Sequence, residues 1–321
     1  MSKAHSKLAH TAEHAFIGAL QKLTGRTLSV RKVEHHDNNN LIVIATTDLD
    51  LDILMAAQSE VNSLINQGRN IIIHNFVSLA EARRVIPDLR ANEERIGINE
   101  HVRVIEIEDH DFAACIMDHA ANLGECGLFL VTRINRTGLE LEVNFVVADS
   151  AKLTSMELAR KMMNLCQVTG GNYNTIEKTV KRLRQTHDMY LEKARLMSEQ
   201  ILDNIESVSS SNSGPRTISS TFVGLLEQQI REFAIRKTAA ENNLVIVIAN
   251  LGVETDSMAS IVLARSGSLR NIDCYKIFSE VSTEWGKGGG KPEFVTGVIK
   301  REYMDHFVNR IVEKIQTKDV L

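Results

Sequence analysis

The sequence lacks any apolar run long enough to cross a membrane, and its first residues are too polar to form the apolar centre of a signal peptide. We therefore expect a cytoplasmic protein with no membrane partner. Cysteine is scarce, with four residues among 321, and in that compartment we expect all four as reduced thiols. An excess of positive charge is also missing, because the formal net charge is −4 at pH 7. A broadly basic surface is excluded, so a nucleic-acid partner would be held by local patches.

What the chain does contain is an ordinary globular composition, with 43% hydrophobic and 24% charged residues. A length of 321 residues is enough for two domains with substantial cores. Composition and pattern divide the chain into three expected parts, residues 1–150, 151–212 and 213–321.

Two pairs of metal-binding residue types have the same internal spacing. His10 and His14 lie in segment 8–23, whose apolar residues recur at helical spacing, and Cys115 and His119 follow about a hundred residues later. Positions four apart on a helix project from one face, so each pair offers two donors to one point. Three imidazoles and one thiolate suit zinc. The four residues are therefore predicted to bind Zn²⁺, although the first pair alone could be surface histidines.

The rest of residues 1–150 alternates between expected strands and helices, which indicates an α+β domain. Strands are expected at 28–45 (two), 70–74, 101–108, 128–134 and 139–147, with helices at 53–65 and after Ser78. Asp52 is interpreted as a helix N-cap, because the spacing of nearby aspartates fails the calcium-loop pattern at its glycine and glutamate positions. His35 and His36 could rim a pocket, but the asparagines after them favour a solvated hairpin tip.

Residues 151–212 are rich in helix formers. A helix is expected at 156–168, ended by Gly170, and a coiled-coil-like helix follows it. The apolar seam of this second helix has spacings of four and three and consists of Ile176, Val180, Leu183, His187, Tyr190, Ala194, Met197 and Ile201. It could pair with the preceding helix or with a second copy of the chain. Residues 207–216, rich in serine, are expected to form a linker.

The last part alternates strands and helices again, which favours an α/β domain. It contains a glycine-rich stretch in which Gly288, Gly289 and Gly290 lie between Lys287 and Lys291. Glycines let backbone amides approach an anion, and the lysines supply charge, so these residues are candidates for RNA or phosphate binding. A flexible loop is the alternative interpretation.

In their order, the motifs of residues 5–150 resemble the editing domain of alanyl-tRNA synthetases and its free-standing relatives. The resemblance rests on HTAEH at 10–14, VIEIED at 104–109, CIMDH at 115–119 and GECG at 124–127. Two features depart from the synthetase pattern: CIMDH stands where CGGTH is usual, and the β-barrel that normally precedes the first histidine is missing. The short free-standing proteins likewise lack the barrel and vary between the cysteine and the histidine.

The resemblance implies a zinc-dependent hydrolase that acts in trans on mischarged tRNA. Its substrate would be alanine tRNA carrying serine or glycine. Water on the metal site would attack the activated ester, and Glu13 and Asp118 are candidates to orient it. Because four protein ligands would close the coordination sphere of the zinc, the alternative is a tRNA- or partner-binding protein with a structural zinc site.

Residues 217–318 resemble the DHH-associated domain found at the end of alanyl-tRNA synthetases and in some phosphoesterases, chiefly through the triple glycine. The resemblance implies contact with tRNA and a homodimer formed through this domain or the helical connector. The aspartate-rich catalytic half of the phosphoesterases and any ATP-binding segment are missing, so neither nuclease activity nor aminoacylation is expected.

The segment 10–14 also fits the inverted zinc-peptidase signature HxxEH, with Glu13 as general base and Glu93 or Glu94 as third ligand. This interpretation leaves Cys115 and His119 without a purpose, so the editing family is preferred.

Overall fold

The computed structural model describes six stretches of the chain, residues 3–36, 39–91, 101–205, 214–253, 255–282 and 285–317. It divides into two compact units, Met1–Ile176 and Glu177–Leu321. Each unit combines helices with sheet: the sheets of the first unit are antiparallel and that of the second is mixed, with one parallel pair, consistent with the expected α+β and α/β classes. The expected division into three parts stays a prediction.

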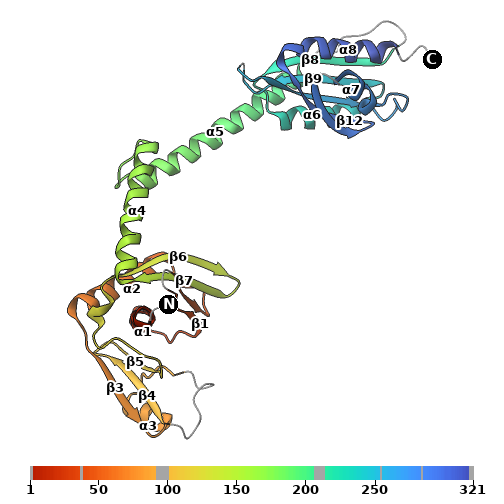
Figure 1. Ribbon diagram of the computed structural model, residues 1–321. Coiled ribbons are helices and arrows are strands. Elements are labelled where there is room, and N and C mark those ends of the chain that lie inside the picture. The colour runs from red at the N-terminus through yellow and green to blue at the C-terminus, as the bar shows by residue number, and fades with distance from the viewer. Residues whose placement is uncertain are drawn as a thin grey trace. The chain divides into compact units, whose positions relative to one another are not determined.

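The core of the first unit lies between a four-stranded sheet and two helices (Figure 1). The sheet has the order β1-β2-β7-β6 and consists of β1 (Val30–Glu34), β2 (Asn40–Ile44), β6 (Phe129–Thr137) and β7 (Glu140–Val147). Helices α1 (Lys3–Thr24) and α2 (Leu51–Gln67) contact each other and pack against it. The rings of Phe16, Phe129 and Phe145 meet at 5.0 Å centroid spacings. The middle of helix α1 is therefore enclosed by the core, and its polar residues His10, Thr11, Glu13 and His14 are buried with it.

The expected strands and helices of this unit are present, with local corrections at their caps. Asp50, not Asp52, caps α2, because its side chain accepts the Ile53 backbone N–H at 2.8 Å. Ser78 caps α3 (Leu79–Val85) as expected, but Glu81 accepts from the Val77 backbone N–H instead of that of the cap residue. Asp52 still lies in the first turn of α2, where its charge favours the helix dipole.

A second sheet, of three strands, leads directly into the segment that contains Cys115 and His119. It has the order β3-β4-β5, with β3 (Ile71–Phe76), β4 (Val102–Ile107) and β5 (Asp111–Ala114) all antiparallel. The short strand β5 contacts α1, and the chain enters the Cys115–His119 segment directly after it. The first unit continues through the 3₁₀ helix η2 (Leu123–Cys126) and ends in helix α4 (Ala148–Thr169), which starts eight residues before the expected position.

The second unit is built around a five-stranded sheet with the order β11-β12-β10-β9-β8. Its strands are β8 (Arg216–Val223), β9 (Leu244–Leu251), β10 (Met258–Arg265), β11 (Gly286–Lys291) and β12 (Phe294–Lys300). Helix α6 (Glu227–Ala240) joins the parallel pair β8 and β9 and covers one face of the sheet. Helices α7 (Cys274–Ser282) and α8 (Met304–Thr317), preceded by the turn η3 (Arg301–Tyr303), cover the other face. The βαβ unit formed by β8, α6 and β9 agrees with the expected α/β class.

The predicted seam lies on helix α5 (Ile176–Asp203), where most of its large apolar members are exposed. Leu183, Tyr190 and Met197 are 48%, 62% and 62% exposed. A coiled-coil pairing of α5 stays a prediction. The expected linker at 207–216 falls mostly on residues 206–213, which lie outside the described stretches, and its last residue, Arg216, begins β8.

The glycine-rich stretch forms the edge strand β11, paired antiparallel with β12, and not a loop. Close packing explains the alternate glycines. A Cβ at Gly288 would lie 2.5 Å from the Phe278 ring, and one at Gly290 would lie 2.2 Å from the Phe294 carbonyl oxygen. At Gly289, whose Cβ would point to the opposite face, nothing lies within 4 Å. The glycines thus allow β11 to lie close to α7 and β12.

Candidate metal centre

Helix α1 presents the first pair of predicted ligands. His10 and His14 are one turn apart and are each 5% exposed, because α1 packs between α2, β5 and β7. Their Nε2 atoms are 3.1 Å apart and their ring centroids 4.8 Å apart. The predicted helix and the predicted convergence of the two imidazoles are both present in the structure.

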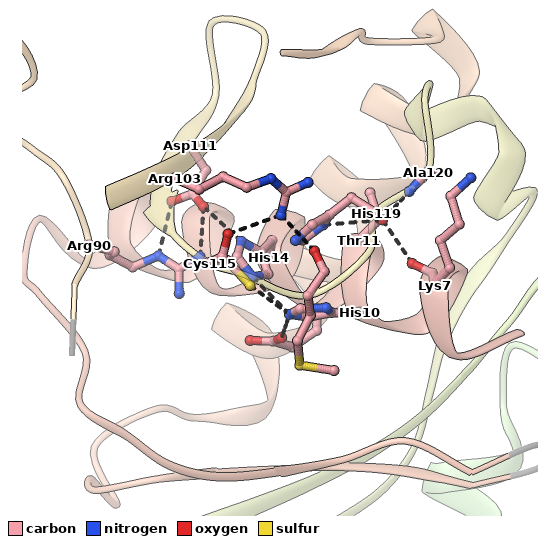
Figure 2. Close-up of polar contacts among 12 residues, drawn as sticks. Lys7, His10, Thr11, His14, Arg90, Arg103, Asp111, Cys115, His119 and Ala120 are labelled. Carbon is pink, nitrogen blue, oxygen red and sulfur yellow. Dashed lines mark hydrogen bonds and ion pairs between the residues drawn. The ribbon is translucent and has the colours of Figure 1, made fainter. Parts of the chain in front are cut away.

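The second pair lies on an irregular loop and not on a helix, which corrects the expectation of two helical pairs. Cys115 and His119 follow β5, and the guanidinium of Arg103 donates hydrogen bonds to the carbonyl oxygens of Cys115 at 3.0 Å and Met117 at 2.8 Å. Both bonds, drawn as dashed lines in Figure 2, join Arg103 to the backbone of the loop that carries the two candidate ligands. Arg103 thus holds Cys115 and His119 near each other, which one turn of a helix was expected to do.

The four side chains from the two segments meet. One donor atom from each of His10, His14, Cys115 and His119 lies within 4.8 Å of the others, and Figure 2 shows the groups facing each other. Bonds of about 2.0–2.1 Å to nitrogen and about 2.3 Å to sulfur at tetrahedral angles separate two nitrogens by about 3.3 Å and a nitrogen from a sulfur by about 3.6 Å. The His10 Nε2 atom is 3.1 Å from His14 Nε2 and 3.5 Å from Cys115 Sγ. The donor set therefore has dimensions that fit one ion.

Burial keeps the three imidazoles neutral. It lowers the pKa of His10 to about 4 and of His119 to about 3, with neighbouring histidines adding to both shifts. Burial, then the nearby Arg90 charge, also lowers the pKa of His14 well below its usual value. Burial raises the pKa of the Cys115 thiol, so the thiol must lose its proton when it binds a metal. Neutral imidazoles are the form that binds metals, so the residues present fit a cation.

A second layer of side chains orients the ligands. The Asp111 carboxylate lies 3.9 Å from His14 Nδ1 and accepts two hydrogen bonds from Arg90, at 3.1 and 2.6 Å. A carboxylate that accepts a hydrogen bond from a ligand histidine fixes its tautomer and raises its basicity. Asp111 lies just beyond that distance, and His14 Nδ1 has no hydrogen-bond partner among the described residues. The Thr11 hydroxyl donates to the Lys7 carbonyl at 2.8 Å and lies 3.4 Å from His119 Nδ1. Because its hydrogen is used, Thr11 can only accept from this ring, which leaves His119 Nε2 free to bind a metal.

The two candidate carboxylates of the motifs lie in different surroundings. Glu13 is 4% exposed, and its carboxylate is 3.8 Å from His10 Nε2, whereas Asp118 is exposed. Burial raises the pKa of Glu13 to about 7, against the opposing effect of Arg90. Glu13 therefore faces the cluster from inside the protein, and Asp118 does not share that enclosed position.

His35 rims this centre, so the interpretation of a solvated hairpin tip was wrong for this residue. Its ring centroid is 5.3 Å from that of His10, and donor atoms of His10, Glu13 and His35 lie within 4.8 Å of one another. His36 is exposed, as expected for a tip, and residues 37–38 lie outside the described stretches. The position of His35 depends on how β1 packs beside α1, which no local pattern signals. The sequence analysis also missed Arg90, Arg103 and Asp111, which carry no motif of their own.

Glu93 and Glu94, the third-ligand candidates of the peptidase interpretation, lie outside the described residues. The meeting of Cys115 and His119 with the α1 histidines gives the second motif a purpose, which that interpretation lacked.

The predicted phosphate-binding residues lie far along the chain, in the second unit. Lys287 and Gly288 border a groove of about 400 Å³ on the sheet face that α6 partly covers, together with Glu227 and Arg231 of α6 and Thr296 of β12. Arg231 is paired with Glu227 at 2.9 Å. Binding of RNA or phosphate by Lys287, Gly288, Gly289, Gly290 and Lys291 stays a prediction.

Comparison with known proteins finds alanine–tRNA ligases among the sequence relatives. The chain is 19% identical over 298 residues to the alanine–tRNA ligase of Hyperthermus butylicus, covering 89% of this chain and 31% of that protein. It is 20% identical over 322 residues to the corresponding ligase of Staphylothermus marinus, covering 95% of this chain and 33% of that protein. The chain is similar in sequence to alanyl-tRNA synthetases. It spans about a third of the length of these relatives, and no family model matches it.

Among solved structures, the C-Ala domain of alanyl-tRNA synthetase from Aquifex aeolicus matches with a TM-score of 0.30 and 17% identity. The match covers 34% of this chain and 99% of that domain. RecJ from Thermus thermophilus, solved in complex with Mn²⁺, matches with a TM-score of 0.29 and 12% identity, covering 45% of this chain and 20% of RecJ. Within the described stretches, none of the helices combines the length and apolarity needed to traverse a bilayer.

Proposed function

We propose that this protein is a trans-acting, zinc-dependent hydrolase that removes serine or glycine from mischarged alanine tRNA. The observation that carries the proposal is the convergence of three imidazoles and one thiol in a chain similar to alanyl-tRNA synthetases. The reaction breaks the ester bond between the amino acid and the terminal ribose. The oxygen of water forms a bond to the carbonyl carbon. The ester oxygen leaves with the ribose and takes a proton from the water, which gives the ribose hydroxyl.

His10, His14, Cys115 and His119 would hold the zinc. When bound, the ion supplies Lewis acidity that polarises the ester carbonyl or lowers the pKa of water. Asp111, held by Arg90, would accept the Nδ1 proton of His14, and Thr11 that of His119. Orientation of the attacking water by Glu13 or Asp118 stays a prediction.

In the second unit, we propose contact with the tRNA backbone at the open face beside α6. Lys287 and Lys291 project from β11 to the face opposite α7, and both are exposed. Because β11 is an edge strand, amides not paired with β12 point outward and are also available to phosphates. A homodimer through the exposed apolar seam of α5 or through the second unit stays a prediction.

The decisive experiment measures deacylation of seryl- and glycyl-tRNA(Ala) by the zinc-loaded protein, with His10→Ala and Cys115→Ala as variants. Elemental analysis before and after the substitutions reports the metal. We expect one zinc per chain and turnover by the wild type, and loss of both in each variant. A zinc-loaded wild type that turns over no mischarged tRNA would contradict the proposal.

The second candidate is a tRNA- or partner-binding protein in which the zinc is structural. One observation favours it: four protein donors in one cluster can fill a tetrahedral coordination sphere. In that case the zinc-loaded protein would bind tRNA with no turnover, and metal removal would destabilise the first unit.

A further inference from the structure

Glu13 is a buried carboxylate that, among the described residues, makes no ion pair with a lysine or an arginine. It is 4% exposed, and among the described residues its closest ion-pair contact is the His10 imidazole at 3.8 Å. Arg90 acts on it through space, but the guanidinium makes its two hydrogen bonds to Asp111. A histidine that binds a metal is neutral, so in the metal-loaded protein the charge that faces Glu13 would be that of the ion, reduced by the Cys115 thiolate.

Burying a carboxylate without a cation costs free energy, and such a group is retained where something else satisfies it. Glu13 lies beside the metal cluster and shares a set of donor atoms within 4.8 Å with His10 and His35. His35, Cys115 and His119 are less deeply buried than Glu13 and the α1 histidines. A ligand that enters from this more exposed side would reach the metal ligands first and meet the Glu13 carboxylate behind them.

We infer that the Glu13 carboxylate binds the α-ammonium group of the aminoacyl ester, so that the site takes esters with a free amino group and rejects N-acylated ones. This inference rests on the proposed function. The ammonium nitrogen of an aminoacyl ester is two bonds from the carbonyl carbon, so a carboxylate next to the metal cluster lies where this cation needs an anion. No bond is made or broken in the recognition step.

The same carboxylate could instead orient the attacking water, and the two roles predict different kinetics. A water-orienting group would act on every ester that enters the site, so its loss would lower kcat equally for free and N-acylated substrates. A group that binds the ammonium acts only on substrates that carry one, so its loss abolishes discrimination between them.

The test compares hydrolysis of seryl-tRNA(Ala) and N-acetylseryl-tRNA(Ala) by the wild type, Glu13→Gln and Glu13→Asp. We expect kcat/KM of the wild type to favour the free amine by about 10- to 100-fold, which is the range of one hydrogen bond to a charged group. Glu13→Gln should reduce this ratio to near one by slowing only the free amine. Glu13→Asp, which keeps the charge, should retain part of the ratio.

Glu140→Gln is the matched control, because Glu140 is an exposed carboxylate at the β6–β7 turn. It should keep the full ratio. Zinc content and circular dichroism of Glu13→Gln show whether the fold and the metal are intact. If Glu13→Gln slows both substrates by the same factor, the carboxylate serves the water and the inference is overturned.

Binding separates the inference from the proposed function. The probes are 3′-(L-serylamino)-3′-deoxyadenosine and its N-acetyl derivative, which resist hydrolysis. Tighter binding of the free amine, lost in Glu13→Gln, supports the ammonium site even if no ester is turned over. A wild type that hydrolyses seryl-tRNA(Ala) but binds both probes equally overturns the inference and leaves the proposed function standing.

Discussion

At the scale of single residues, the buried carboxylate of Asp111 has the clearest predicted effect on metal binding. It accepts hydrogen bonds from Arg90 and lies 3.9 Å from His14 Nδ1, where a small shift would let it accept the ring N–H once Nε2 binds a metal. We expect Asp111→Asn to weaken zinc affinity by about 10- to 100-fold, measured by competition with a chelator of known affinity.

The matched control is Asp109→Asn, because Asp109 is an exposed carboxylate that pairs with Arg69 at 3.0 Å. Its zinc affinity should equal that of the wild type. Equal affinities for the Asp111 variant and the wild type would show that this carboxylate has no influence on the site.

A second residue-scale prediction concerns pH. His110 is buried beside α1, and burial lowers its pKa below the usual 6.5, despite a hydrogen bond to the Ala15 carbonyl oxygen at 2.8 Å. Because the folded-state pKa is depressed, the folded protein favours the neutral ring. This contribution to stability is present above pH 6.5 and is lost as the pH falls through the folded-state pKa.

We therefore expect the free energy of unfolding to fall more steeply between pH 7.5 and pH 5 in the wild type than in His110→Gln. Urea denaturation at several pH values measures the difference. The contributions of the other histidines cancel because both proteins contain them. Parallel curves would mean that His110 titrates alike in the folded and unfolded states.

At the scale of elements, the edge strand β11 depends on alternate glycines. A Cβ at Gly288 would lie 2.5 Å from the Phe278 ring, whereas one at Gly289 meets nothing within 4 Å. We expect Gly288→Ala to lower the free energy of unfolding by about 1–3 kcal/mol, the usual cost of overpacking. Gly289→Ala should change it by less than about 0.5 kcal/mol. Chemical denaturation of the two variants checks this pair, and equal effects would mean that β11 does not pack against α7.

Elements also show how far the sequence could predict the structure. The helix of His10 and His14 was predictable because its apolar residues repeat over four turns. The loop of Cys115 and His119 was not, since its bend depends on Arg103, a residue of a neighbouring strand. His35 and Asp111 reach the site through strand pairing and helix packing, which no local spacing records. The triple glycine predicted that another group would approach the backbone closely. At Gly288 that group is the Phe278 ring of the same unit.

At the scale of the whole molecule, the metal ligands all belong to the first of two compact units. Metal removal should therefore lower only one of two thermal transitions in calorimetry. At free zinc about 100 times Kd the ion adds about 2.7 kcal/mol, which corresponds to a shift of roughly 5–11 °C for a unit of this size. In His14→Ala the same transition should not respond to chelator. A uniform shift of both transitions would contradict two independently stable units.

The separation of the ligands along the chain has a consequence for synthesis. His10 and Cys115 are 105 positions apart. At about 5–20 residues per second, the ribosome exposes the two α1 histidines roughly 5–20 s before the cysteine follows. Of the four predicted ligands, the nascent chain during that interval offers only the two imidazoles, a pair that would bind several divalent ions weakly and with little preference. Commitment to one ion would wait for the thiolate, so metal selection would be a late event of biogenesis.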